Sequence, residues 1–207
     1  NIEKCEFVRN EAGQSGAVYL KNSDTKIWDC IFSYNRAHTM SALVQEGGSS
    51  IAYNCLIINN VDVSRSGAAA VFYQSVALVM NCTITDNNTG GVGYCDQGTK
   101  LINCIVTDNV GLDINRYSGT FENCLASETD GDYKGIVLRK PVFKDPAQGD
   151  YRLANGSPGI DMGKIEGAPE FDIEGRKRLE GDGLVDIGAY EVQPVPPGLE
   201  IVPRFTG

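Results

Sequence analysis

Three periodic features of the 207-residue chain predict an all-β fold, a right-handed parallel β-helix of about six coils with a C-terminal cap. A cysteine recurs every 20 to 27 residues, an asparagine follows it after five residues, and an apolar residue stands two positions after it. Self-similarity at this spacing is typical of solenoids, and an apolar period of two residues indicates strands. The apolar column consists of Phe7, Phe32, Ile57, Ile84, Val106 and Ala126.

The cysteine column marks one equivalent position in each coil. Neighbouring members are expected about 4.8 Å apart with parallel Cβ vectors. Disulfides need Cβ atoms that tilt toward each other, and zinc needs ligands that converge, so we expect buried free thiols. Cys95 lies outside the column and is either a free thiol or an ordinary strand residue. The column is Cys5, Cys30, Cys55, Cys82, Cys104 and Cys124.

The asparagine column is expected at the turn that follows each cysteine strand. Asparagine tolerates left-handed backbone, and its amide can bond the same amide one rung away. Such a ladder satisfies polar groups that would otherwise be buried without partners. We expect it to end in the last coil, where Thr129 takes this position. The ladder is Asn10, Asn35, Asn60, Asn87 and Asn109.

The repeat stops after residue 130, which suggests three parts: coils at 1–130, a capping segment at 131–192 and a Pro-rich tail at 193–207. A β-helix end exposes unpaired strand edges and apolar rungs, so a cover is expected there. The stretch VDIGAYE (185–191) is expected to add a final strand over the last rung.

The charged residues of the capping segment suggest a partly buried ion network that has a structural role. Its expected members are Asp161, Asp172 and Asp186 against Arg176 and Arg178.

Two sets of motifs carry a family resemblance. FVRN (7–10), FSYN (32–35) and SGAVYL (15–20) resemble repeats of polymorphic outer-membrane proteins and other pectate-lyase-like β-helices. DYRL (150–153), SPGIDMG (157–163) and DIGAYE (186–191) resemble the choice-of-anchor Q segment of bacterial surface β-helix proteins. The second resemblance implies an exported protein, extracellular or on a bacterial cell surface, whose C-terminal segment caps the solenoid.

Charge and hydropathy exclude several partners. The net charge of −9 argues against nucleic acid, which needs a basic footprint, and mildly against a polyanionic polysaccharide. No apolar run is long enough to span a membrane. The chain opens only four residues before Cys5, so we expect either further coils upstream or self-association through the uncapped N-terminal coil.

A column of acids is the candidate metal site. Asp86, Asp108 and Glu128 each stand four residues after a column cysteine, on consecutive rungs. Stacked carboxylates repel each other and favour a cation, either Ca²⁺ or a nearby basic side chain. The alternative is a solvated corner at which the acids splay apart. No cofactor other than this possible Ca²⁺ is indicated.

Aromatic residues are the candidate carbohydrate site. Trp28 and Tyr53 both stand two residues before a column cysteine, on adjacent rungs. If they point outward, they form a stacking surface for a sugar ring, and if inward, they belong to the core. Tyr34 is a further candidate.

The leading functional hypothesis is a secreted or cell-surface protein without catalytic residues, glycan-binding and adhesin-like or structural, with polysaccharide as the possible partner. The alternative is a fragment of a Ca²⁺-dependent polysaccharide lyase or of a glycoside hydrolase, because this fold carries many functions. A basic residue within reach of the acid column and a groove along one strand face would favour the enzyme.

Overall fold

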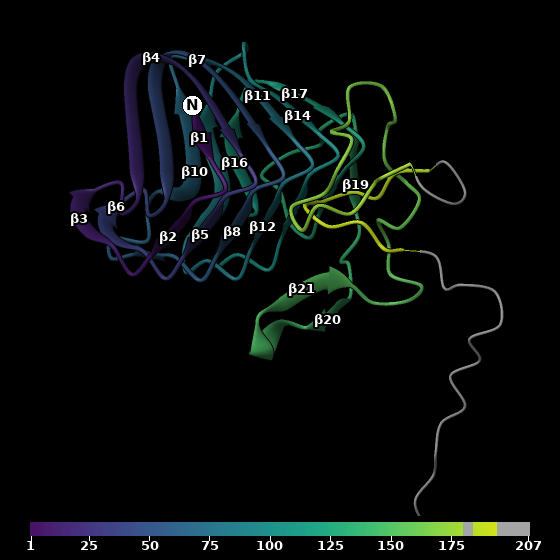
Figure 1. Ribbon diagram of the computed structural model, residues 1–207. Coiled ribbons are helices and arrows are strands. Elements are labelled where there is room, and N and C mark those ends of the chain that lie inside the picture. The colour runs from purple at the N-terminus through teal and green to yellow at the C-terminus, as the bar shows by residue number, and fades with distance from the viewer. Residues whose placement is uncertain (180–183, 194–207) are drawn as a thin grey trace, which may run out of the picture.

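The computed structural model describes residues 1–179 and 184–193, and the tail predicted at 193–207 lies outside the described residues from 194 onward. Its coils stack into a parallel β-solenoid (Figure 1), which confirms the predicted fold class. The six column cysteines are separated by five turns. In the described part of the chain, no helix is long and apolar enough to cross a membrane.

The cysteine strands form one parallel sheet, which we call the cysteine sheet. Ile57 stands opposite Phe32 on one side and Ile84 on the other, so residues one coil apart lie directly above each other. The sheet contains β2 (Glu6–Val8), β5 (Ile31–Ser33), β8 (Leu56–Ile58), β12 (Thr83–Thr85), β15 (Ile105–Thr107), β18 (Cys124–Ala126) and β19 (Ile136–Leu138).

A nine-stranded parallel sheet, the long sheet, forms the opposite wall. Each of its first full coils contributes one strand of 11 residues, whereas later coils contribute two shorter ones. Its strands are β1 (Ile2–Glu3), β4 (Val18–Trp28), β7 (Leu43–Tyr53), β10 (Ala68–Tyr73), β11 (Val76–Met80), β13 (Gly90–Cys95), β14 (Lys100–Ile102), β16 (Ile114–Tyr117) and β17 (Thr120–Glu122).

Two smaller sheets complete the fold. A short three-stranded parallel sheet joins the two walls and contains β3 (Glu11–Gln14), β6 (Arg36–Thr39) and β9 (Val61–Asp62). An antiparallel hairpin follows the coils in the sequence. It contains β20 (Phe143–Asp145), the 3-10 turn η1 (Pro146–Gln148) and β21 (Asp150–Leu153).

The cysteines stack inside the core as free thiols. The backbone N–H of Cys55 donates to the sulfur of Cys82 at 3.4 Å, so equivalent positions on adjacent rungs are in contact. Cys95 is also buried in the core, on β13, and is therefore an ordinary strand residue.

The asparagine ladder is present, and it runs in one direction. Each side-chain Nδ2 donates to the Oδ1 of the next rung, at 2.8 to 2.9 Å from Asn10 through Asn109. As predicted, the asparagine ladder does not continue to Thr129. Asn109 donates to the buried carboxylate of Asp113 at 3.0 Å, whereas Thr129 bonds to Gly131. A carboxylate suits this end because it accepts without needing to donate.

Most of the predicted capping segment lies along the side of the coils. We call residues 140–179 and 184–193 the strap. Leu153 and Ile187 pack on the outward-facing Ile105 and Leu125 of the cysteine sheet. Residues 184–193 form no strand, so the predicted final strand is wrong. The start of the predicted capping segment, before the strap, contributes Tyr133 and Ile136, which pack against the core of the coils.

The predicted ion network of the strap is centred on Arg178, which is 1% exposed. Its Nη1 pairs with Glu191 at 3.0 Å, and its Nη2 donates to Asn54 Oδ1 at 2.9 Å. Buried Asp172 and Asp186 join the same network, because they accept hydrogen bonds from the backbone N–H groups of Glu191 and Val192. Burial, and then the charge of Asp186, raise the pKa of Glu191 to about 8.

Candidate carbohydrate-binding cavity

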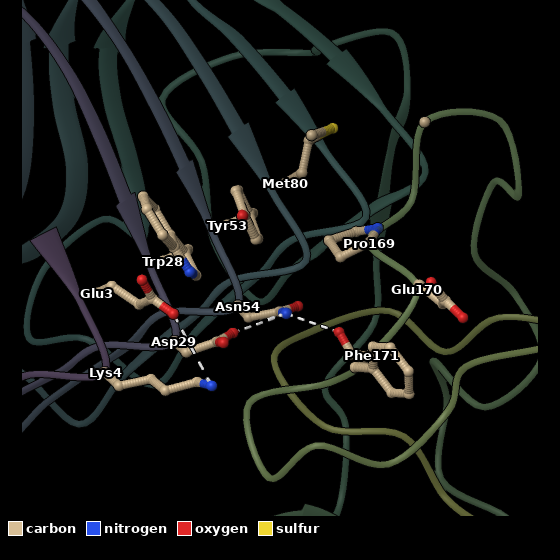
Figure 2. Close-up of a pocket in the computed structure, with 11 residues that line it drawn as sticks. Glu3, Lys4, Trp28, Asp29, Tyr53, Asn54, Met80, Pro169, Glu170 and Phe171 are labelled. Atoms are coloured by element: carbon tan, nitrogen blue, oxygen red, sulfur yellow. Dashed lines mark hydrogen bonds and ion pairs between the residues drawn. The ribbon is translucent and has the colours of Figure 1, made fainter. Parts of the chain in front are cut away.

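Trp28 and Tyr53 end two neighbouring strands of the long sheet and point out of the core. They are partners in register, and their rings stack with centroids 5.9 Å apart and planes 10° apart. Both side chains are half-buried, while the residues before them, Ile27 and Ala52, are buried in the core. The structure therefore gives the outward arrangement that an aromatic platform requires (Figure 2).

The platform is the middle of a longer column on the outer face of the long sheet. Met80 stands beside Tyr53 on the next rung and also lines the cavity. Acids occupy both ends of the column, and the one at the far end pairs with two lysines. In register, the column runs Glu3, Trp28, Tyr53, Met80, Ile102 and Glu122.

One wall of the cavity belongs to the strap. Gly167, Pro169, Glu170 and Phe171 face the aromatic column across a space of about 360 Å³. Asn54 fixes this wall, because its Nδ2 donates to the Phe171 carbonyl at 2.7 Å (Figure 2). Packing of the strap thus shapes the cavity as well as covering the cysteine sheet.

The residues that anchor the strap form a second asparagine column, directly before the cysteines, which the sequence reasoning missed. The signal was visible as the dipeptide Asn-Cys in four of the six repeats. All four asparagines have left-handed backbone, with φ near 50°, and their amides reach strap carbonyls. The pairs are Asn54 with Phe171, Asn81 with Asp186, Asn103 with Lys164 and Asn123 with Met162.

The charged groups of the cavity are mostly acidic. Glu3, Asp29 and Glu170 line it, and Lys4, which lies 3.8 Å from Glu3, is the one cation among the described lining residues. Asp29 accepts a hydrogen bond from Asn54 at 3.0 Å. Burial raises the pKa of Asp29, although this hydrogen bond and the charge of Lys4 oppose the shift. The cavity therefore offers aromatic ring surface beside hydrogen-bond acceptors.

Tyr34, the third aromatic candidate, does not join this platform. It lies after β5, at the opposite end of the cysteine strand from Trp28, and is 51% exposed. The Arg9 guanidinium sits over its ring, 5.6 Å from the centroid. Tyr34 therefore forms a separate surface pair with Arg9.

The structure does not bring the acid column together as the calcium hypothesis requires. Asp86 accepts from the Tyr151 hydroxyl at 2.9 Å, and Asp108 pairs with Lys140 at 2.5 Å. Across the residues that the structure describes, no group of three or more His, Cys, Asp and Glu side chains could hold a metal ion. Asp86 and Asp108 instead bind the strap, and Glu128 is an exposed residue on the rung beyond them.

Asp86, Asp108 and Lys140 do share an open hollow of about 690 Å³ with Phe143. Lys140 supplies the basic residue whose presence would favour an enzyme. However, the hydrogen bond from Lys140 to Asp108 raises the pKa of the lysine, so its amine is held protonated and is a poor base.

The coils, their amide ladder and the laterally packed strap define a β-helix protein with an aromatic cavity on one face. A family model described as a right handed beta helix region matches residues 1–132, more than half of the chain. The chain therefore belongs to the right-handed β-helix family. No curated protein and no solved structure matches it.

Proposed function

We propose that this protein binds carbohydrate on the outer face of its long sheet, in the cavity at Trp28 and Tyr53. The observation that carries the proposal is the ordered stack of these two rings inside a hollow lined by carboxylates. Aromatic rings contact the apolar faces of sugars, and carboxylates accept hydrogen bonds from sugar hydroxyls.

The negative charge of the acids that line the cavity restricts the class of sugar that can bind. Glu3, Asp29 and Glu170 surround the platform, and the chain carries a net charge of −9. A polyuronate would be repelled by both the local and the overall charge. Neutral or amino-sugar oligosaccharides are therefore the proposed ligands, and we propose that they are bound without being cleaved.

We place the protein outside the cell or on a bacterial cell surface. The support is the resemblance of the C-terminal motifs to those of surface β-helix proteins, and the carbohydrate site proposed above fits that location. Export is tested by locating the protein in culture medium, surface and cytoplasmic fractions of its host.

The binding test uses the intrinsic fluorescence of Trp28, the single tryptophan of the chain. Neutral and amino-sugar oligosaccharides are titrated while emission is followed, with oligogalacturonate as the acidic comparison. Tyr53→Ala keeps the reporter and is expected to weaken binding about tenfold, which corresponds to about 1.4 kcal/mol. Tyr34→Ala, an exposed aromatic outside the cavity, is the control and is expected to bind normally. If no neutral or amino sugar changes the emission or produces heat in calorimetry, the proposal fails.

Polysaccharide cleavage is the second candidate, because Lys140 lies beside Asp108. New reducing ends or unsaturated uronate released by the wild type, and lost in Asp108→Asn, would establish it. The protonated state of Lys140 makes this the weaker candidate.

A further inference from the structure

A second cavity lies on the long sheet, toward the opposite end of β4 and β7 from Trp28. It encloses about 340 Å³. Tyr19 and Trp28 lie nine positions apart on β4, which is about 30 Å of strand at about 3.3 Å per residue. The two cavities are therefore independent sites on one sheet.

The cavity is a cup with an apolar floor and aromatic walls. Val44 and Val71 are adjacent in register, are buried and form the floor. The walls are Tyr19, Tyr73 and Tyr94, and Met40 and Gln14 complete the lining. Three tyrosines around one apolar floor give a concave surface rich in π-electron density.

The tyrosine hydroxyls already have protein partners. Tyr94 donates to the Ser66 carbonyl at 3.0 Å, and the Tyr73 oxygen accepts from Gln74 at 3.1 Å. The Tyr19 hydroxyl donates to the Glu46 carboxylate. These bonds hold the rings in place, so what the walls offer to a ligand is mainly ring surface.

Among the described residues that line the cup, Glu46 is the one that carries a charge. The hydrogen bonds from Tyr19 and Lys21 lower its pKa, so it is ionised at neutral pH. The Lys21 amine lies 3.3 Å from the carboxylate, but its side chain is 61% exposed, and such a solvated pair neutralises a carboxylate only weakly. The cup therefore combines ring surface with a negative charge at its rim.

We propose that this cup binds a quaternary ammonium cation, such as the trimethylammonium group of a choline-type ligand. The methyl groups and the diffuse positive charge would face the tyrosine rings above the floor of Val44 and Val71, with Glu46 at the rim. A primary ammonium ion needs three acceptors, and a neutral sugar needs several polar partners. The partners already held by the hydroxyls disfavour both, whereas a quaternary ammonium group has no N–H to satisfy.

The test compares choline with 3,3-dimethylbutan-1-ol, its uncharged isostere, by calorimetry and by NMR of the tyrosine ring protons. Choline is expected to bind the wild type at least about tenfold more tightly than the alcohol. Tyr73→Leu keeps apolar bulk but removes π density, and Glu46→Gln keeps the acceptor for Tyr19 but removes the charge. Each is expected to weaken choline binding about tenfold.

Trp28→Ala is the matched control, because it removes an aromatic of the same sheet outside the cup, and choline binding should be unchanged. Unfolding midpoints of all variants verify that they fold. No choline binding to the wild type overturns the proposal. Equal binding of choline and the alcohol, or wild-type affinity in both cup variants, overturns it as well. Because sugar binding is read at Trp28, either proposal can fail without the other.

Discussion

Truncation of a central ladder asparagine should cost far more stability than truncation of the same residue at the end of the column. Asn60 is fully buried, and five hydrogen bonds end on its side chain. Its Nδ2 shares two hydrogens among two backbone carbonyls and the Asn87 Oδ1, and its Oδ1 accepts from the backbone and side chain of Asn35. Asn60→Ala removes all five.

The expected loss follows from the groups that remain without partners. The buried backbone N–H of Asn35 loses the acceptor on Asn60, which costs about 1–3 kcal/mol. The other bonds contribute about 0.5–1.5 kcal/mol each, and part of this is recovered because Asn35 keeps its bond to the Phe7 carbonyl. A total of about 3–5 kcal/mol is therefore expected.

Asn10→Ala is the matched control. Asn10 is exposed at the first rung, and its side chain makes one ladder bond, to Asn35 at 2.9 Å. Its truncation should cost less than about 1 kcal/mol. Urea unfolding followed by Trp28 fluorescence gives both free energies. A difference between the two variants of less than about 1 kcal/mol would refute the reasoning, because burial and bond count would then not set the contribution of a rung.

Three further predictions concern the ladder end, the strap and the thiols. Asp113→Asn should lower the free energy of unfolding in urea by about 2–4 kcal/mol. If the amide oxygen of the new asparagine accepts from Asn109, its NH₂ group faces the backbone N–H groups of Ser127 and Glu128, which then lose their acceptor. Glu191 binds its proton more tightly in the folded state, with its pKa raised from 4.5 to about 8, so stability should fall as pH rises between these values. Glu191→Gln should flatten that slope, and an unchanged slope contradicts the assignment. A thiol reagent should modify at most Cys5 in the native protein and all seven cysteines after unfolding, and a lower count in denaturant would reveal a disulfide.

Residue columns made the solenoid predictable from sequence alone. A cysteine, an inward apolar residue and an asparagine recur once per coil because stacking places them in identical surroundings on each rung. The group that terminates the ladder, Asp113, was not predictable in this way. Asp113 stands four residues after Asn109, within the same coil, so no alignment of repeats places it in the asparagine column.

The position of the strap depends on residues whose meaning is ambiguous in a sequence. Leu56, Ile105 and Leu125 are apolar at outward positions, so these strands are apolar on both faces. Strands of this kind are typical of sheets covered on both sides. The sequence thus contained evidence for a lateral cover, but not for which segment supplies it.

The orientation of Trp28 and Tyr53 was undecidable from alternation. Asp29 and Asn54, which separate them from the inward cysteines, have φ of 53° and 51°. A left-handed residue breaks the two-residue alternation of side chains, so the inward direction of Cys30 and Cys55 does not fix that of residues two positions earlier. Only the coordinates place both rings outside the core.

Two faces of the same solenoid are used in opposite ways. The cysteine sheet is apolar on its outer face and is covered by the strap, whereas the long sheet keeps its outer aromatic columns open and carries both cavities. The two faces are linked at Asn54, which binds Arg178 of the buried network and the Phe171 carbonyl of the cavity wall. A ligand that contacts this wall binds only molecules with the strap in place, so its binding energy adds to the stability of the strap. Sugar binding at Trp28 should accordingly protect strap amides from hydrogen exchange, while choline in the tyrosine cup, which has no strap residue in its lining, should leave them unchanged.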